Sequence, residues 1–276
     1  MNTRNAVVEG QFYPATKERI FEQIQEIERA NRYQVPELSP DRIFGAVLPH
    51  AGHIYSGYQT IPFFQLIKRL EMYPETFIII HPNHSGLGQS VAIDDSDVWH
   101  NSIGEVPMDR DFASALDLPF DRWAHFKEHS AEVIIPFLQY YLTDHPFSIV
   151  PICMRDQSYQ SASLIAKQIK KAVRETGHKI MLLASSDFSH FLSPEDGQKK
   201  DQHILENILA RNAQGVEVAV NKHQISACGY GPIMTLMEYA CAIESDYNVE
   251  ILARGHSGEV NPSREVVDYI SMIMYQ

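Results

Sequence analysis

Two apolar segments of the chain end in the same way, and this repeated pattern limits the folds that the chain can adopt. Residues 43–48 are typical of a buried strand and are followed by Pro49-His50-Ala51-Gly52. Residues 76–80 are equally apolar and are followed by His81-Pro82-Asn83-His84. A helix is expected over residues 58–70, between the two strands. Strand, helix and strand at this spacing predict a right-handed βαβ unit, which brings both strand ends to one edge of a parallel sheet.

Strands and helices alternate along the rest of the chain. Further strands are expected over residues 147–153, 179–184, 249–254 and 266–274, and helices after Thr16 and over residues 128–141, 161–176, 201–211, 215–222 and 233–240. Residues 90–109 have no regular apolar pattern, and we expect a hairpin or a lid there. Because no linker divides the chain, we expect one α/β domain over residues 1–276, around a mixed, largely parallel sheet with antiparallel late strands at one edge.

The composition excludes several classes of partner. Lysine and arginine number 23 against 35 acidic residues, which gives a net charge of −12. This charge argues against nonspecific binding to nucleic acid and against electrostatic attachment to membranes. The three cysteines are too few for a disulfide framework, and no apolar run approaches the ~20 residues of a membrane span. We therefore expect a cytoplasmic protein without nucleic-acid or membrane partners.

Four polar positions follow apolar runs or stand at turns beside Gly, Pro or Ser. They are His50, His84, Asp187 with His190, and Cys228. Imidazole and thiolate groups are good ligands for iron, copper and zinc. Three protein ligands with open coordination positions are typical of a catalytic metal site. A histidine near the metal could move a proton, and an aspartate could orient it.

Each of these residues also has a simpler explanation. A lone loop histidine is most often solvated or hydrogen-bonded, and a lone cysteine such as Cys228 is most often a small buried apolar residue. Asp187 could cap the helical segment that follows it and leave His190 solvated. His53 and His129 fit either the lining of a site or the surface, and His81 fits a structural role.

Several short motifs, taken together and in order, carry a resemblance. The chain resembles the Memo family, also called AmmeMemoRadiSam system protein B, in residues 8–14, Pro49-His50-Ala51-Gly52, Pro82-Asn83-His84, Glu128-His129-Ser130, residues 185–190 and Cys228-Gly229. The family's fold is similar to that of the LigB-like class III extradiol dioxygenases. The resemblance therefore implies an α/β sandwich with one metal-centred cleft.

The resemblance also implies roles for residues. Its metal ligands match His50, His84 and Cys228, and its acid–base pair matches Asp187 and His190. Candidates for lining the cleft are His53, Tyr55, His81, Glu128 and His129. The implied metal is Fe(II) or Cu, and Zn is a further candidate for the metal that the purified protein carries. The implied partners are a small-molecule or peptide substrate and, from the family's name, AMMECR-type and radical-SAM proteins.

Three functions are compatible with these residues. The first is a metal-dependent oxidoreductase, in which a cysteine at the third ligand position favours copper or a redox-active iron. The second is a metal-binding or peptide-binding module that keeps the cleft without turnover. The third is a hydrolase with Cys228 as nucleophile and His190 as base, which leaves His50 and His84 without a role.

Overall fold

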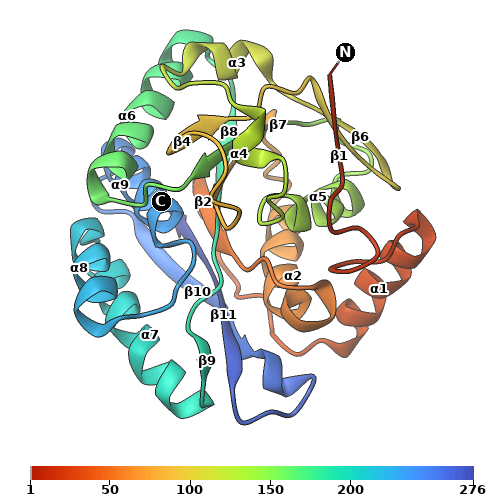
Figure 1. The fold of residues 1–276 in the computed structure, drawn as a ribbon, viewed down its shortest axis with the longest axis vertical. Coiled ribbons are helices and arrows are strands. Elements are labelled where there is room, and N and C mark those ends of the chain that lie inside the picture. Colours follow the sequence, from red (N-terminus) through yellow and green to blue (C-terminus); the bar gives the residue numbers. More distant parts are fainter. Residues whose placement is uncertain (1) are drawn as a thin grey trace.

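An eight-stranded mixed sheet lies at the centre of the computed structural model, which describes residues 2–276 (Figure 1). The strand order is β10-β11-β2-β8-β3-β7-β4, and β9 pairs with β11. The strands are β2 (Ile43–Leu48), β3 (Thr76–Pro82), β4 (Val91–Ile93), β7 (Ser148–Met154), β8 (Ile180–Ser185), β9 (His190–Leu192), β10 (Asn248–His256) and β11 (Val266–Tyr275). The four central strands are parallel, whereas β10, β11 and β4 pair in antiparallel fashion. The predicted α/β class with a mixed sheet is confirmed.

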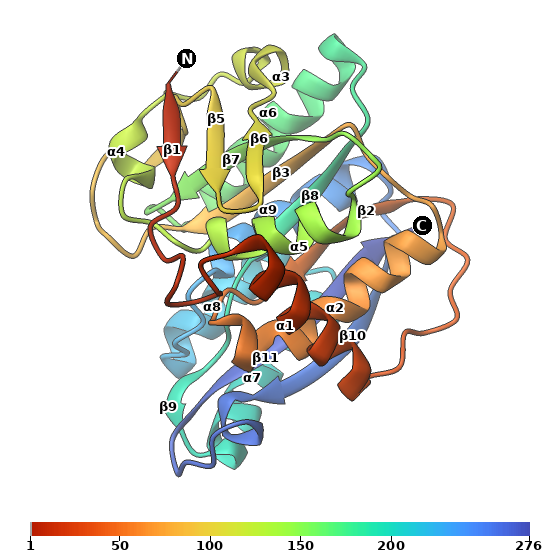
Figure 2. The ribbon, with the colours of Figure 1, turned by 90° about the vertical axis from the view of Figure 1, so that its right-hand side faces the viewer.

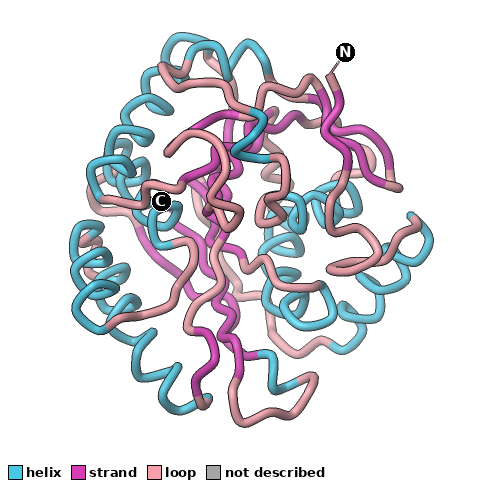
Figure 3. Tube along the Cα trace, in the orientation of Figure 1, coloured by secondary structure: helices cyan, strands magenta, loops and turns pink. Residues whose placement is uncertain are grey.

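Helices cover both faces of the sheet. They are α1 (Lys17–Ala30), α2 (His53–Arg69), α3 (Arg110–Ala115), α4 (Arg122–His125), α5 (Ile135–Tyr141), α6 (Tyr159–Thr176), α7 (Pro194–Leu209), α8 (Ala213–His223) and α9 (Tyr230–Ile243), with short 3-10 helices η1 (Glu132–Ile134) and η2 (Ser257–Glu259). In Figure 1, α6, α8 and α9 lie on one side of the strands and α1, α2 and α5 on the other. Figure 3 shows the same strands enclosed by helices. None of the helices in residues 2–276 combines the length and the apolarity that crossing a bilayer requires.

The irregular region before α3 contains a hairpin, as one of the two predictions for it stated. Strands β5 (Val98–Asn101) and β6 (Gly104–Pro107) pair in antiparallel fashion. The N-terminal strand β1 (Thr3–Asn5) joins β5 in parallel, and the three form a small second sheet beside the main one (Figure 2). Residues from the start of the chain are thereby fixed near residues 97–107.

The central strands are buried along their whole length because both faces of the sheet are covered. Every residue of β2, β3 and β8 is buried, which is why these strands are continuous apolar runs in the sequence. In the outer layer, α1 begins after Thr16, whose side chain accepts a hydrogen bond from the backbone N–H of Arg19. One buried apolar cluster extends from Tyr13 to Met274.

Several predicted helix boundaries are wrong, and the largest difference is in α7, which begins at Pro194 rather than at residue 201. Helix α2 begins at His53 rather than at residue 58, with Gly52 as its N-cap. Residues near its start include the weak helix formers Ser56 and Gly57, so the sequence does not indicate the earlier start. The helix predicted from residue 128 begins only at Glu132. Glu128 lies in the preceding loop, where its carboxylate accepts hydrogen bonds from local backbone N–H groups, a competition that disfavours a helix. Glu128 and Glu132 therefore do not share a helix face.

Candidate metal centre

His50 is fixed at the carboxyl end of β2 by two contacts. Its backbone N–H donates to Asp187 Oδ1 at 2.8 Å, and its ring Nδ1 lies 2.7 Å from Ser185 Oγ. The residue is 2% exposed. Because β2 pairs in parallel with β8, residues 185–187 that follow β8 lie next to the end of β2.

The hydrogen bonds around Ser185 decide which nitrogen of His50 carries its proton. Ser185 Oγ donates its single proton to the carbonyl oxygen of Ser130 at 2.7 Å. The same oxygen can then only accept from His50, so Nδ1 of His50 is protonated. Nε2 is left with a free lone pair, and it lies 3.1 Å from Cys228 Sγ. Burial, followed by the nearby His84 and His129, lowers the pKa of His50 well below its usual value. A neutral imidazole with a free nitrogen is the form that binds metals.

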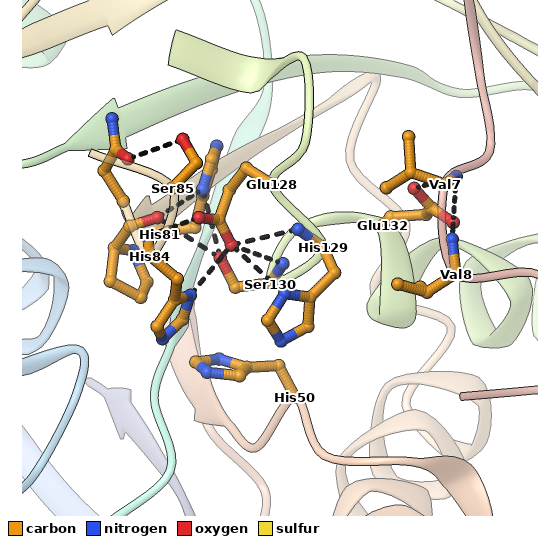
Figure 4. A network of polar contacts seen from close by, with 12 residues as sticks. Val7, Val8, His50, His81, His84, Ser85, Glu128, His129, Ser130 and Glu132 are labelled. Atoms are coloured by element: carbon orange, nitrogen blue, oxygen red, sulfur yellow. Dashed lines mark hydrogen bonds and ion pairs between the residues drawn. The ribbon is translucent and has the colours of Figure 1, made fainter. Parts of the chain in front are cut away.

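His84 is oriented by the buried carboxylate of Glu128, which Figure 4 shows at the centre of a polar network. His84 Nδ1 lies 2.9 Å from Glu128 Oε1, and the His84 backbone N–H donates to Oε2 at 2.5 Å. The backbone N–H groups of His129 and Ser130 and the hydroxyl of Ser130 also donate to Oε1. An ionised carboxylate only accepts, so Nδ1 of His84 carries the proton and Nε2 is free. A carboxylate that fixes a histidine in this way is a common support for metal ligands.

The charge of Glu128 follows from these contacts. Burial alone would raise the pKa of Glu128, but its hydrogen bond from His84 and the nearby His81 outweigh burial and lower this pKa strongly. Burial of His84 would lower the pKa of its imidazole, but the hydrogen bond and the charge of Glu128 raise it overall. Glu128 is therefore an anion that orients His84, and its Oε1 is already saturated with donors.

Cys228 reaches the site from the side of the sheet that carries α9, whereas α2 lies on the other side (Figure 1). It stands one residue before the N-cap of α9. The approach is close because the N-cap is Gly229, where a Cβ would lie 2.1 Å from the carbonyl oxygen of Ser185. The Gly229 N–H donates to Ser186 Oγ at 3.0 Å, and the backbone N–H of Asp187 lies 3.2 Å from Cys228 Sγ. Burial, with the charge of Asp187, raises the pKa of the Cys228 thiol well above its usual value. A bound cation would favour the thiolate.

The three predicted ligand residues come together. One donor atom each of His50, His84 and Cys228 lies within 4.8 Å of the other two. A second group, His84, Glu128 and His129, meets the same criterion, but the carboxylate of this group is occupied by hydrogen bonds. The imidazole rings of His50, His84 and His129 lie on one side of Glu128 (Figure 4), with ring centroids 5.0–5.7 Å apart.

The predicted acid–base pair lies beside this group. Asp187 was expected to orient His190, but the two side chains have different hydrogen-bond partners. Asp187 accepts from the backbone of His50, while His190 Nδ1 lies 2.8 Å from the carbonyl oxygen of Ser226. The carbonyl therefore orients the imidazole of His190, and Asp187 does not. Because a carbonyl only accepts, Nδ1 of His190 is protonated and Nε2 is free. Burial raises the pKa of Asp187 to about 6 against the opposing effects of the His50 N–H and of His190.

The candidate lining residues are divided between the site and the core. His129 lies at the site, with its ring 4.7 Å from that of Phe12, and Tyr55 is half-buried in the first turn of α2. His53 is fully buried behind the site, where Nε2 contacts the Val133 carbonyl at 2.8 Å. His81 is also fully buried and contacts His125 Nδ1 at 3.2 Å. The structure thus places His53 and His81 in the core rather than in the lining.

Two residues that support the site received no role from the sequence. Ser185 is the last residue of β8, so the strand-end pattern that indicated His50 also points to it. Arg4 is 8% exposed and donates to Glu132 Oε2 at 2.9 Å and to the carbonyl oxygens of His125 and Glu128. Arg4 thus holds the loop that carries Glu128, and nothing in the local sequence around Arg4 indicates this contact.

Comparisons with known proteins agree along the whole chain. The sequence model described as "Memo-like protein" matches residues 4–273. A MEMO1 family protein of Methanococcoides burtonii is 34% identical, over 98% of this chain and 99% of its own. A MEMO1 family protein of Archaeoglobus fulgidus is 35% identical, over 98% of each chain.

A solved structure shares the fold. The crystal structure of an uncharacterised protein from Escherichia coli K12 superposes with a TM-score of 0.53 and 12% identity. The match covers 84% of this chain and 99% of that chain. From the family model and the full-length relatives, the chain belongs to the Memo family.

Proposed function

We propose that this protein is a metal-dependent oxidoreductase whose iron or copper ion is held by His50, His84 and Cys228. The observation that carries the proposal is the convergence of their three donor atoms within 4.8 Å. In two supporting hydrogen bonds, Nδ1 of His50 donates to Ser185 and Nδ1 of His84 donates to Glu128, which leaves the Nε2 atom of each imidazole free. This donor set fits iron or copper, because imidazole suits both metals and thiolate is a soft, electron-rich ligand.

The chain's own residues would handle protons beside the ligands. A bound iron or copper would supply an open coordination position and one-electron chemistry. His190 has its Nδ1 proton fixed by the Ser226 carbonyl, so its Nε2 can take a proton from a substrate hydroxyl. The raised pKa of Asp187, about 6, lets this carboxyl exchange a proton near neutral pH. We infer that Asp187 and His190 act as acid–base groups.

Metal analysis after anaerobic purification tests the proposal. We expect close to one iron or copper ion per chain, and a loss of at least about tenfold in His50→Ala, His84→Ala and Cys228→Ser. Matched controls are His145→Ala and Cys241→Ser, two exposed residues of the same types, and both should retain the metal. If the three site variants hold as much metal as the parent, the assigned ligands are wrong.

Oxygen uptake then separates an enzyme from a binding module. An oxidoreductase should consume oxygen with at least one member of a panel of catechols, and Asp187→Asn and His190→Ala should lose this turnover while retaining metal. A metal-loaded protein that consumes no oxygen with any reductant or catechol would favour the alternative, a metal-binding or peptide-binding module that uses the same cleft.

A cysteine hydrolase is less well supported by the same geometry. The imidazole beside the thiol is that of His50, whose Nε2 lies 3.1 Å from Cys228 Sγ, whereas the predicted base His190 is held by the Ser226 carbonyl. Burial, however, raises the pKa of Cys228 and lowers that of His50, so both groups are neutral and no thiolate is stabilised. Hydrolysis that is abolished by alkylation of the thiol in metal-free protein would reverse this preference.

A further inference from the structure

Phe191 occupies a backbone position that normally needs glycine. In the antiparallel pair of β9 and β11, His190 opposes Val267 and Leu192 opposes Val266. Phe191 is therefore the extra residue of a β-bulge. Its φ is 58°, in the left-handed region. Bulges with this conformation usually have glycine at that position, because a Cβ is disfavoured there.

The side chain of Phe191 gains little from packing. It is 72% exposed, more than any other large apolar side chain among the exposed ones of residues 2–276. A phenyl ring in water contributes little of the free energy that buried aromatic rings provide. Phe191 thus adds backbone strain that no burial of its ring offsets, and neither the bulge nor the core accounts for the ring.

The strained residue directly follows His190, the predicted acid–base residue beside the candidate metal centre. The ring centroid of Phe191 is 5.9 Å from that of His190, whose charge affects the pKa values of both His50 and Asp187. Bulges are frequent beside active sites, where they redirect a side chain. Strained backbone conformations also cluster at sites that bind ligands.

We propose that Phe191 contacts the substrate, stacking on a planar apolar group while the polar end of the same molecule reaches the metal ligands. The proposal rests on the metal centre described above and adds the class of its substrate, a metal-chelating molecule with an aromatic ring. Stacking of this kind needs one open aromatic face. A protein partner would instead cover a contiguous apolar patch, whereas the neighbours of Phe191 in β9 are His190 and the half-buried Leu192.

Binding of two metal ligands that differ in aromaticity tests the proposal. The metal-loaded parent, Phe191→Gly and Phe191→Leu are titrated with 4-nitrocatechol and, separately, with azide. We expect 4-nitrocatechol to bind about tenfold more weakly to the glycine variant, with leucine between the two. Azide, which has no ring, should bind all three equally. The control is Trp123→Ala, which removes an exposed aromatic ring of α4 and should change neither affinity.

Thermal unfolding checks the strain independently of any ligand. Phe191→Gly should unfold at the same temperature as the parent or a higher one, because glycine relieves the left-handed conformation. A clear fall in the midpoint would show that the ring is structural and would overturn the proposal. Equal affinity of parent and Phe191→Gly for 4-nitrocatechol would also overturn it, in favour of a role such as protein docking.

Metal content, measured first, separates failure of this proposal from failure of the metal centre. If the parent takes up no metal, the proposed oxidoreductase is contradicted, and saturation-transfer NMR of 4-nitrocatechol with the metal-free protein takes the place of the titration. A transfer signal that is lost in Phe191→Gly supports aromatic contact at Phe191. No signal from the parent, or equal signals from both proteins, rejects it.

Discussion

The two ring nitrogens of His50 have different partners, and Ser185 creates the difference. The hydroxyl of Ser185 accepts from Nδ1 only because its own proton is committed to the Ser130 carbonyl. Ser185→Ala removes the acceptor, so the tautomer with Nε2 free is no longer favoured. We expect the affinity for metal to fall about 10–100-fold, as measured by competition with a chromophoric chelator. The exposed Ser102→Ala is the control; an unchanged affinity in Ser185→Ala would refute this role.

Glu128 is a second supporting residue, with consequences for folding as well as for metal. Its carboxylate is 1% exposed and receives hydrogen bonds from five donors. In Glu128→Gln, one accepting oxygen becomes an amide that faces these donors. We expect a loss of about 2–4 kcal/mol in the free energy of unfolding, measured by urea denaturation. The exposed Glu105→Gln should change it by less than about 0.5 kcal/mol.

The sequence indicates which residues are candidates better than it indicates where their side chains point. His50 and His84 were identifiable because each follows an apolar strand and a proline. His53, only three residues after His50, could not be assigned from the same turn. Its place in the core depends on α2 starting at His53, which the extended Gly52 N-cap permits. The bond between His190 and the Ser226 carbonyl joins residues 36 positions apart, so local spacing suggested Asp187 instead.

Among the elements, the junction of β8 with α9 controls the third ligand. In Gly229→Ala, the added Cβ would meet the Ser185 carbonyl and the Ser186 side chain, so α9 must move away and take Cys228 with it. We expect a loss of about 1–3 kcal/mol in stability and a weaker hold on metal, measured by denaturation and metal analysis. Gly177→Asn, at the C-cap of α6, replaces a left-handed glycine at the far end of β8 and should retain metal.

The strands were predictable as elements, but their order in the sheet was not. The apolar runs of β2, β3, β7 and β8 stand out because covered strands need apolar residues on both faces. The expected unit of β2, α2 and β3 has its strands parallel, yet β8 lies between them. This insertion depends on contacts between segments about a hundred residues apart, which no local pattern contains. It also brings Ser185 and Asp187 between His50 and His84.

For the whole molecule, a buried pair of carboxyl groups should limit stability at high pH. Asp201 is fully buried and Asp268 is 5% exposed, and their Oδ2 atoms have no donor other than a proton that the pair can share. Burial and then Asp201 raise the pKa of Asp268 to about 8, and burial raises that of Asp201. An unfolded aspartate has a pKa of about 3.9, so this contribution is complete below that pH and is lost as pH rises towards 8.

Asp268→Asn tests the pair, because its amide donates a hydrogen bond at every pH. The parent should lose up to about 1.4 kcal/mol of stability per pH unit from this pair between pH 6.5 and 8. The stability of the variant should change less with pH over that range, and the variant should be more stable than the parent at pH 8.5. Urea denaturation at several pH values measures both curves; parallel curves would show that Asp268 is ionised in the folded protein.

Buried histidines should limit stability at low pH. Burial lowers the pKa of His53 to about 4 and those of His81 and His125 to about 3. Their contribution is complete above the unfolded value of about 6.5 and is lost as pH falls towards 3. With the carboxyl pair acting on the alkaline side, we expect maximum stability near pH 6.5. On the acid side, Asp268→Asn should make stability rise more steeply with pH between about 4 and 6.5, because the opposing loss from Asp268 is removed.

The contact between His50 and Cys228 joins residues 178 positions apart. A pairing with so large a sequence separation has a high entropic cost of loop closure and tends to form late in folding. During synthesis, the first 227 residues are joined before the thiol of Cys228 exists. We therefore expect the metal to bind after the chain has folded. The rate of metal uptake by refolding chains would then measure the rate of the last folding step.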